Sequence, residues 1–565
     1  MTQPAELILP PIDPAAAATL PGFLDEIAGK FGSREALVLH DALRGGARVS
    51  WSYDELRARS RAVARALIAA GVEKGARVGI LIANRPEFAA ALFGVALAGG
   101  VAVTLSTLST AEELATLLNL SDVGLVLTQR QIGKHRLDEQ IAELFTDRPM
   151  RDHGSIADPR FPYLTRFIVL GLEGEGRLIQ GWESFLAGGE RVADALLDAR
   201  AARVSMNDTA VIIFTSGTTS QPKGVIHLQR TFVWQFRWQS HIYGRGLETR
   251  IWSPFPLFWS AGIVSVLGST LAVGGCWIGQ EVFEPGEALA LMTREKVTEP
   301  YGFPTHTAAL AEHPDWPTAD LSSLTRVRGN NEFDSHPNTR PDPTWNMIVA
   351  YGMSESCTAI VSHLSTAPVE DQAKNSGRPL PGVQLRIVDF ETGASLPAGG
   401  EGEICVRGPT MMERYVGFAR EECFDADGFF HSGDTGFIDG EGYLHWTGRI
   451  KNMVKTGGAN VASGEVEAAA TALGTLKLCR VIGMPDRRLG EMVVLCAVKA
   501  DGVETTEDEV RAAIRQRLAA YKTPKRVLFF SIEDYPLTAS GKVKDKELRE
   551  LVAARTAPSP EPSES

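Results

Sequence analysis

The chain has 565 residues, of which 44% are hydrophobic and 22% charged, and its formal net charge is −12. This length exceeds one ordinary domain core, so we expect two or more packed units, and the composition is that of a globular protein. The acidic balance gives no general electrostatic reason to bind nucleic acid, which we do not expect as a partner. Six cysteines are scattered without a C-x-x-C pair. This pattern indicates neither a disulfide framework nor a zinc site and fits a reducing cytoplasm.

Two apolar stretches, residues 88–105 and 251–280, contain no charged residue and reach the length of a membrane-spanning helix. Glycines and prolines within them instead predict a buried helix that runs into a buried strand, as in covered α/β sheets. The N-terminal arm contains several prolines and lacks a basic region followed by an apolar core, so it does not fit a secretory signal. We therefore expect a cytoplasmic protein without a transmembrane segment.

Helix and strand signals alternate along the chain. Ser52 and Glu55 have the spacing of a capping box at the start of a helix. Apolar runs at residues 78–83, 123–127 and 210–214 predict buried strands. Such alternation predicts an α/β fold whose large N-terminal domain contains parallel sheets with helices.

Glycine-rich turns between short strands over residues 377–458 predict an antiparallel or barrel-like subdomain. A new unit begins after this stretch. We assign residues 1–449 to the N-terminal domain and residues 450–555 to a small α+β C-terminal domain. Residues 556–565 are mostly Pro, Ser and Glu and predict a disordered tail.

The string Phe-Thr-Ser-Gly-Thr-Thr-Ser-Gln-Pro-Lys-Gly occupies residues 214–224, directly after an apolar strand. Glycine permits close backbone approach, hydroxyls and amides can cradle phosphate oxygens, and Lys223 adds a positive charge. The residue order is not that of a Walker A loop. A Ser/Thr/Gly loop by itself is often only a solvated turn, but the complete string is far more specific.

This string resembles the signature of the superfamily of acyl-CoA synthetases, nonribosomal-peptide adenylation domains and firefly luciferases. Further motifs of that superfamily recur in order at residues 51–53, 351–355, 432–434, 448–449 and 536–542. The resemblance implies ATP with Mg²⁺ as the activating system and a small C-terminal domain that is mobile between two half-reactions. The implied reaction converts a carboxylic acid and ATP to an acyl adenylate, and then transfers the acyl group to coenzyme A.

The resemblance also implies roles for residues of an ATP site. Glu355 matches the magnesium ligand, and a hard carboxylate oxygen suits that metal. Tyr351 resembles the residue that stacks on adenine, Asp434 the carboxylate that accepts the ribose hydroxyls, and Arg449 the arginine of the ribose and phosphate region. Without the motifs, these would read as an ordinary loop glutamate, core tyrosine and turn aspartate. The remaining implied contacts are Thr215 (also to the metal), Ser216, Gly217, Thr218, Thr219, Asn330, Asn331, Gly352 and Ser354.

Lys542 carries the main mechanistic hypothesis. In the first half-reaction two negatively charged reactants approach each other, so a preorganised ammonium group between them would stabilise the transition state. The expected catalytic residues are therefore Lys542, Lys223 and Glu355. A lysine in a Ser-Gly-Lys turn is often a surface residue, but the surrounding Pro-Leu-Thr-Ala-Ser-Gly-Lys string favours the catalytic role.

The second half-reaction requires a different surface. Lys451 occupies the family's hinge position, about which the small domain turns. Gly457 and Gly458 match the segment that lines the pantetheine tunnel in related ligases, where glycine suits close approach to a narrow ligand. Basic residues that could contact the coenzyme A nucleotide are suggested by composition alone: Arg480, Arg487, Arg488, Lys522, Lys525 and Arg526.

Some positions depart from the usual family pattern. Trp259 stands where many relatives have histidine, and Asn330 and Asn331 stand where small residues are common. We expect Trp259 and Gly302 to line an acyl pocket that takes a medium-chain, long-chain, cyclic or aromatic acid in preference to acetate. The alternatives are that the aromatic residues are ordinary core and that the asparagines only fix a loop.

Three other functions remain open at this stage: an adenylating enzyme that loads a carrier protein or another acceptor, a luciferase-like oxygenase, and a non-catalytic nucleotide sensor. The presence of Lys542, Glu355 and Asp434 disfavours the sensor. The sequence leaves open which acid is bound and which oligomer forms, a homodimer being one option.

Overall fold

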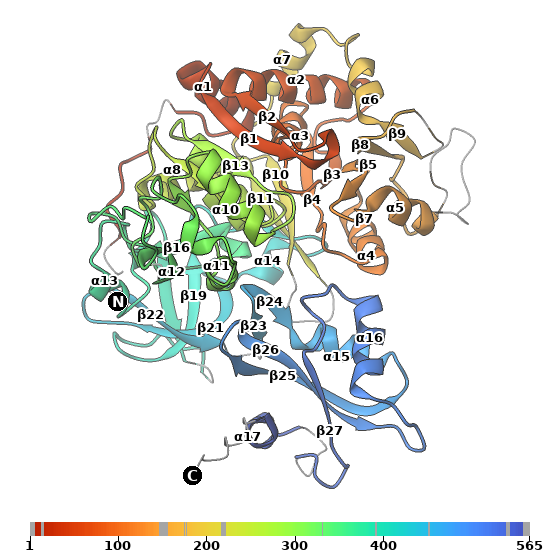
Figure 1. Cartoon of the computed structure of the whole chain (residues 1–565), viewed down its shortest axis with the longest axis vertical. Helices are drawn as coiled ribbons and strands as arrows, with labels where there is room; N and C mark the ends of the chain where they lie inside the picture. Colours follow the sequence, from red (N-terminus) through yellow and green to blue (C-terminus); the bar gives the residue numbers. More distant parts are fainter. Residues whose placement is uncertain are drawn as a thin grey trace. The chain divides into compact units, whose positions relative to one another are not determined.

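The computed structural model describes residues 6–12, 16–145, 156, 158–174, 176, 178–215, 222–329, 331–389, 392–449, 453–537 and 543–556. The chain divides into a large unit, formed by most of residues 1–450, and a smaller unit, formed by residues 451–565 together with residues 108–113 and 216–223. Figure 1 labels many of the elements in each unit.

The largest sheet has eight strands, and its six consecutive strands β10 to β9 all run parallel. Strands β4 and β5, within this run, are buried over their whole length, as expected for a parallel sheet covered on both faces. In spatial order the eight strands are β20 (Arg414–Tyr415), β11 (Lys223–Leu228), β10 (Thr209–Thr215), β4 (Val101–Thr104), β3 (Arg77–Leu81), β5 (Leu125–Gln129), β8 (Arg166–Leu170) and β9 (Ile179–Gly181).

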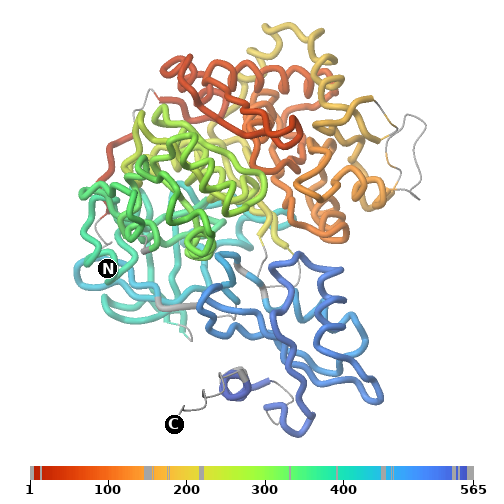
Figure 2. Tube along the Cα trace, viewed as in Figure 1, coloured from red at the N-terminus to blue at the C-terminus, as the bar shows by residue number. Residues whose placement is uncertain are grey.

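A second sheet in the large unit joins segments that are distant in the sequence. Its strand β1 pairs in parallel with β13, and the two can be followed as neighbouring red and green segments in Figures 1 and 2. Its five strands are, in order, β14 (Glu299–Pro300), β12 (Arg250–Trp252), β13 (Cys276–Gly279), β1 (Glu35–Asp41) and β2 (Ala47–Ser52).

Helices pack around these sheets. Ser52 and Glu55 form the predicted capping box at the start of α2, which packs against the fully buried α3. The apolar stretch at residues 88–105 is a buried helix that leads into the buried strand β4, as predicted. The helices of the large unit are α1 (Leu20–Phe31), α2 (Tyr53–Ala69), α3 (Pro86–Leu97), α4 (Ala111–Ser121), α5 (Leu137–Phe145), α6 (Trp182–Gly188), α7 (Asp194–Ala201), α8 (Gln229–Ile242), α9 (Ser269–Leu271), α10 (Pro285–Arg294), α11 (Pro304–Ala311), α12 (Asn331–Asp334), α13 (Val369–Gln372) and α14 (Arg420–Cys423).

The glycine-rich stretch forms antiparallel sheets, which confirms the antiparallel form of the prediction. A three-stranded sheet contains β15 (Ala350–Met353), β16 (Thr358–Ser362) and β17 (Arg378–Pro379). A four-stranded sheet contains β18 (Gln384–Val388), β19 (Gly402–Arg407), β21 (Phe430–Ile438) and β22 (Leu444–Arg449).

The small unit has the predicted α+β composition. In its five-stranded sheet β26 pairs with β25 and β23 in antiparallel and with β27 in parallel. Its elements are β23 (Met453–Thr456), β24 (Ala459–Ala462), α15 (Ser463–Thr471), β25 (Leu476–Asp486), β26 (Gly490–Lys499), α16 (Glu507–Arg517), β27 (Arg526–Phe529) and α17 (Asp545–Thr556).

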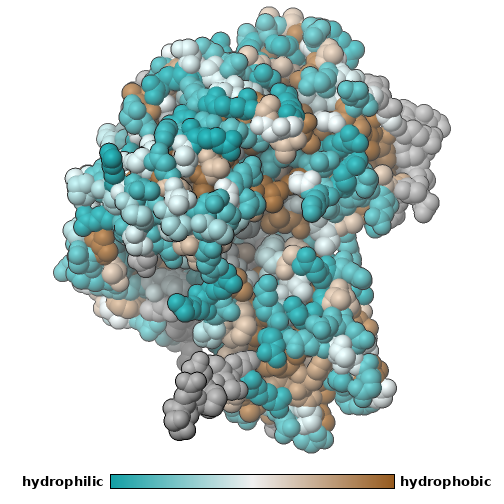
Figure 3. Space-filling view, viewed as in Figure 1, coloured by the Kyte–Doolittle hydropathy of each residue, from teal (hydrophilic) through white to brown (hydrophobic). Residues whose placement is uncertain are grey.

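Among the described residues, no helix is both long enough and apolar enough to cross a lipid bilayer. Polar residues dominate the face of the molecule shown in Figure 3, with apolar residues scattered between them. The six cysteines are all free thiols.

A buried ion cluster links segments at or after the ends of strands of the eight-stranded and five-stranded sheets. Arg85, which precedes α3, donates two hydrogen bonds of 2.8 Å to the carboxylate of Asp41 at the end of β1. It also contacts Glu281 at 2.7 Å and Glu87 at 3.2 Å. Burial by itself would raise the pKa of Asp41, but the hydrogen bonds and charge of Arg85 lower it overall. Pairing with Arg85 therefore compensates for the burial of these carboxylates.

We expect Arg85→Ala to lower the free energy of unfolding by about 3–5 kcal/mol, because it leaves buried carboxylates without their counter-charge. Urea unfolding followed by tryptophan fluorescence measures this change. Arg44→Ala is the matched control, since Arg44 also pairs with Asp41 but its side chain is 54% exposed; its cost should stay below about 1 kcal/mol. Equal losses in the two variants would contradict the role of the cluster.

Candidate functional site

Three parallel strands end at one edge of the large sheet. Ile213 of β10 and Ile80 of β3 both lie opposite Thr104, the last residue of β4. Because ligands of open α/β sheets bind beyond the carboxyl ends of the strands, this edge is the natural place for a site. The predicted phosphate loop leaves the sheet here, immediately after Thr215. Ser216, Gly217, Thr218 and Thr219 lie outside the described residues, and Lys223 begins β11.

Buried polar side chains tie an aromatic loop to the same edge. Asn84, three residues after β3, donates a 3.0 Å hydrogen bond to the carbonyl of Phe255 and accepts a 2.9 Å bond from the backbone N–H of Leu257. Thr104 donates a 3.0 Å hydrogen bond to the carbonyl of Phe258. Both tethers are buried, so breaking either would leave an unsatisfied polar group in the core. The loop is thereby held next to the end of β10.

Two segments of this region meet because β12 and β14 are parallel neighbours, with Trp252 opposite Pro300. The ring of Phe255, after β12, lies with its centroid 4.3 Å from that of Phe303, after β14. Gly302 lies against this loop, since a Cβ there would be 3.6 Å from Pro254. Trp259 is partly buried, packs on the core and has its ring centroid 5.8 Å from that of Phe258.

Phe255 and Phe258 are buried core residues, whereas the half-buried Trp259 leaves part of its ring accessible. A π-helical turn (Gly262–Gly268) follows directly. Such turns are frequent at functional sites. The described residues thus place apolar aromatic area at this edge, with Trp259 as its accessible member.

His306 was not predicted from the sequence and adds a neutral imidazole to the aromatic group. Its ring stacks on Phe303 with a centroid distance of 5.8 Å, and its Nδ1 accepts a 3.1 Å hydrogen bond from the backbone N–H of Phe303. Burial lowers the pKa of His306 to about 4. The ring is therefore uncharged near neutral pH, with its proton on Nε2.

Tyr351 and Asp434 are brought together from two different antiparallel sheets. The Tyr351 hydroxyl donates a 2.9 Å hydrogen bond to Oδ2 of Asp434, and both residues are buried. Asp434 lies opposite Arg449 in the β21–β22 pair; the side chain of Arg449 is outside the described residues. Gly352 allows close packing, because a Cβ there would lie 2.0 Å from the carbonyl oxygen of Thr358. The predicted ribose and adenine residues are thus direct neighbours.

Glu355 lies one turn further along, in the short 3₁₀ helix Ser354–Ser356. The hydroxyl of Tyr415 donates a 2.7 Å hydrogen bond to Oε1 of Glu355, and Tyr415 was not predicted from the sequence. The next two residues, Cys357 and Thr358, have positive φ angles of 62° and 131°. Backbone strain of this kind costs about 1–3 kcal/mol per residue and persists where surrounding contacts enforce it.

Those enforcing contacts come from β11 and α8, which follow the phosphate loop. Gln235 of α8 donates to the carbonyl oxygens of Ser356 at 3.2 Å and Ala359 at 3.0 Å. His227 of β11 donates a 2.7 Å hydrogen bond from Nε2 to the carbonyl of Ser354. Burial lowers the pKa of His227 to about 4, so it acts as a neutral donor. The same chain segment therefore begins at the phosphate loop and fixes the turn that carries Glu355.

Several predicted residues are not gathered into this arrangement. Lys542, Lys451 and Asn330 lie outside the described residues, and Asn331 begins α12 with its side chain undescribed. Gly457 and Gly458 form the turn between β23 and β24 of the small unit, with φ angles of 57° and 79° that favour glycine. The roles of these residues stay predictions.

Comparison with known proteins identifies the family. Residues 24–416 match the family model of AMP-binding enzymes, and residues 465–542 match that of the AMP-binding enzyme C-terminal domain. A feruloyl-CoA synthase from Amycolatopsis is 32% identical over 88% of this chain and 93% of its own length. A Rhodococcus jostii ligase that joins coenzyme A to a methyl-dioxo-octahydroindenyl propanoyl group is 30% identical over 94% and 98%.

Among solved structures, the amide bond synthetase McbA from Marinactinospora thermotolerans is 27% identical, with a TM-score of 0.73 over 94% of this chain and 99% of that one. The chain therefore belongs to the family of AMP-binding enzymes, which confirms the family resemblance and the fold class predicted from the sequence. Within that family it is an AMP-forming acid–thiol ligase of the acyl-CoA synthetase class.

We expect Tyr415→Phe to reduce kcat/KM for ATP at least tenfold, because a hydrogen bond to a charged group is worth about 1.5–3 kcal/mol. Exchange of labelled pyrophosphate into ATP measures this step. Tyr163→Phe is the control, since Tyr163 is 62% exposed. An unchanged rate in Tyr415→Phe would show that the hydroxyl does not position Glu355.

Proposed function

We propose that this enzyme is a carboxylic acid–coenzyme A ligase. In the first half-reaction the acid and ATP give acyl-AMP and pyrophosphate, and in the second acyl-AMP and coenzyme A give acyl-CoA and AMP. The observation that supports this most directly is the 2.9 Å hydrogen bond between the buried residues Tyr351 and Asp434. Tyr351 lies on β15, the strand that leads into the Glu355 turn. An aromatic ring beside a carboxylate suits an adenosine, whose base stacks and whose ribose donates hydrogen bonds.

The residues around Glu355 fit a magnesium ion. Glu355 is a half-buried carboxylate held by Tyr415 at 2.7 Å, and Thr215 supplies a hydroxyl at the end of β10. Both are hard oxygen donors, which Mg²⁺ prefers together with phosphate oxygens and water. We propose that Glu355 and Thr215 hold this ion, which would neutralise charge on the triphosphate.

The remaining nucleotide contacts follow from the motifs. We propose that residues 215–224, with Lys223, bind the phosphates, and that Arg449 contacts the ribose and phosphate region. The adenine side is completed by Gly352, Ser354, Asn330 and Asn331. Residues 1–449 would then form the ATP and acyl domain.

Residues 450–555 would form a mobile domain that serves both half-reactions. Lys542 would act in adenylation, Lys451 as the hinge, and Gly457 and Gly458 beside the pantetheine of coenzyme A. This assignment rests on sequence motifs, together with the glycine turn between β23 and β24. Free cysteines throughout the chain favour a reducing compartment such as the cytoplasm.

The aromatic residues favour a bulky apolar acid. Phe255, Phe303 and the half-buried Trp259 lie at the edge where the phosphate loop begins, and the neutral His306 adds no positive charge for a second carboxylate. The related feruloyl and octahydroindenyl ligases carry names of ring-bearing acids. We therefore propose a medium-chain, long-chain, cyclic or aromatic acid as the substrate.

A second candidate differs only in the acceptor. The amide bond synthetase McbA shares 27% of its residues with this chain over nearly its whole length, and its name indicates an amine acceptor. An enzyme that transfers the acyl group to a carrier protein or another acceptor would use the same adenylation site. Coenzyme A is favoured here because the two curated relatives cited above are coenzyme A ligases.

We expect Lys542→Ala to lose acyl-adenylate formation by two or more orders of magnitude, because the ammonium group acts mainly in the transition state. Thioester formation from supplied acyl adenylate and coenzyme A should change far less. Lys544→Ala is the matched control, since Lys544 lies two residues away and is paired with Glu547 at 3.2 Å.

Equal losses in both half-reactions would show that Lys542 is structural. In the wild-type enzyme, acid-dependent AMP release should increase when coenzyme A is added and should yield an acyl-CoA product. If coenzyme A has no effect while an amine or a carrier protein stimulates release, the ligase uses that other acceptor.

We expect Trp259→Ala to change the ranking of acids, because an indole offers roughly 150–250 Å² of surface for burial against the acyl group. The measurement is kcat/KM for acetate, octanoate and a ring-bearing acid. Trp446→Ala, on β22, serves as the control, since Trp446 is 38% exposed. Acetate as the best substrate, or an unchanged ranking, would refute the pocket assignment without affecting the ligase assignment.

A further inference from the structure

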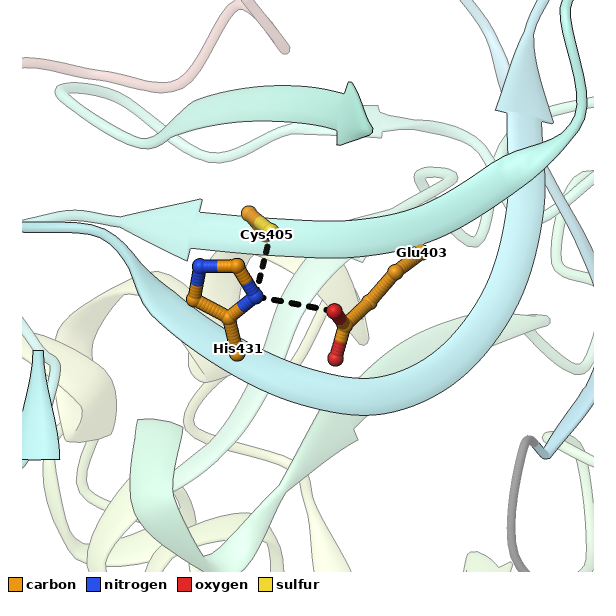
Figure 4. A group of neighbouring side chains, drawn as sticks. All are labelled: Glu403, Cys405 and His431. Atoms are coloured by element: carbon orange, nitrogen blue, oxygen red, sulfur yellow. Dashed lines mark hydrogen bonds and ion pairs between the residues drawn. The ribbon is translucent and has the colours of Figure 1, made fainter. Parts of the chain in front are cut away.

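Three side chains with metal-binding atoms converge on the four-stranded antiparallel sheet. Glu403 and Cys405 are two positions apart on β19, and His431 lies directly opposite Cys405 on β21. One ligand atom from each of the three residues lies within 4.8 Å of the others. Figure 4 shows Nδ1 of His431 facing both the sulfur of Cys405 and the carboxylate of Glu403. The three residues are 28 positions apart at most.

The distance between His431 and Cys405 suits a shared cation. Nδ1 of His431 is 3.5 Å from Sγ of Cys405 and 2.8 Å from Oε2 of Glu403. Two ligands of a tetrahedral zinc ion, one nitrogen and one sulfur, lie about 3.5 Å apart when their bonds to the metal are about 2.0 and 2.3 Å. A single ring nitrogen carries at most one proton, so hydrogen bonding alone does not satisfy both neighbours of Nδ1.

A further carboxylate stands where an outer-shell partner of a metal site is expected. Nε2 of His431 lies 3.5 Å from Oδ2 of Asp425. Metal-binding histidines commonly donate their second ring N–H to a carboxylate, which fixes the tautomer and orients the ring. Asp425 is in turn paired with Arg386 and accepts a 2.8 Å hydrogen bond from the backbone N–H of Phe429. A fixed carboxylate thus lies within ion-pair distance on the far side of the imidazole.

The three ligand residues differ in their exposure to solvent, and the most exposed of them leaves a route for a metal ion. Cys405 is buried beside Val388 and Phe429, whereas the side chain of His431 is 45% exposed and that of Glu403 is 17% exposed. A cation can therefore enter from the side of His431, and water can complete its coordination. Thiolate, imidazole and carboxylate together select an ion of the zinc type over Mg²⁺ or Ca²⁺, which prefer oxygen ligands.

We propose that Glu403, Cys405 and His431 form a binding site for a zinc-type divalent transition metal, separate from the proposed magnesium site. On binding, the Cys405 thiol releases its proton to solvent and the thiolate sulfur, Nδ1 of His431 and a Glu403 oxygen become ligands. The ion would cross-link β19 and β21. The second oxygen of Glu403 accepts a 3.0 Å hydrogen bond from the backbone N–H of Gly433, the residue before Asp434. The bound ion would therefore restrain the backbone that carries Asp434.

The test is titration of the full-length, chelator-treated protein with Co²⁺ and Zn²⁺, without ATP or magnesium. We expect one Co²⁺ per chain, a thiolate-to-cobalt charge-transfer band and its loss when Zn²⁺ is added. Cys405→Ser should abolish the band, and the exposed His431→Gln should weaken Co²⁺ binding at least tenfold. Asp425→Asn should weaken it about 10- to 100-fold, the usual effect of removing an outer-shell partner. Zn²⁺ should also raise the unfolding temperature of the wild-type protein but not of His431→Gln.

Cys423→Ser is the matched control, because Cys423 is a partly buried thiol of the same unit outside the cluster. The proposal is overturned if the wild-type protein shows no thiolate band, or if His431→Gln and Cys405→Ser bind Co²⁺ as Cys423→Ser does. Circular dichroism of each variant without metal separates lost binding from lost folding. Since the His431 side chain is 45% exposed, its variant keeps the test decisive even where Cys405→Ser fails to fold. The readout is independent of ligase activity, so either proposal can fail while the other stands.

Discussion

Parallel pairing of β10, β4 and β3 places the carboxyl ends of these strands at one edge, and the candidate site is built outward from that edge. The phosphate-loop string leaves β10 there, while Asn84 and Thr104 hold the aromatic loop beside it through hydrogen bonds of 2.9–3.0 Å. Because these tethers are buried, water cannot replace them, so the loop has one favoured position. The sheet thereby places the aromatic loop beside the end of β10, the strand that leads into the phosphate-loop string.

The second element of the site depends on the segment after the phosphate loop. β11 and α8 extend from that loop, and their buried polar residues His227 and Gln235 bond the backbone around Glu355. The strained residues Cys357 and Thr358 are held by these contacts and by the packing of β16. The neutral form of His227 can donate this hydrogen bond at a fully buried position, where a charged imidazole would be costly.

Ionisable groups with little exposure to water are accommodated in different ways in this protein. Arg85 lies within 3.2 Å of three carboxylates. Although burial acts to raise the pKa of Asp41, the hydrogen bonds and charge of Arg85 lower it overall. His227 and His306, which lack such partners, are neutral because burial lowers the pKa of each to about 4. The Glu403–Cys405–His431 cluster is a third case, in which three unlike ligand groups face one another on β19 and β21. Because Glu403 bonds the backbone of Gly433, the residue before Asp434, a metal bound to this cluster would restrain the backbone of the proposed ribose site.

The sequence by itself determined the family, the alternation of helices and strands, and the contiguous motifs, because each of these depends on residues that are near neighbours in the chain. The Ser52–Glu55 capping box and the strand ending at Thr215 are local features of this kind. Tertiary structure alone decided which distant residues support the site. Tyr415 is 60 positions from Glu355, and Asn84 is 171 positions from Phe255.

Spacing in the sequence also indicated no zinc site, yet strand register placed His431 opposite Cys405. A buried glutamine or an isolated histidine carries no local signal of its partner, since the same residue type serves equally well on a solvated surface. Gln235 and Gln239 lie one turn apart among the buried residues of α8, but their spacing does not identify the residues that they bond. Only the folded sheet and helix arrangement brings such groups within hydrogen-bonding distance, because long-range contacts follow from topology and not from spacing along the chain.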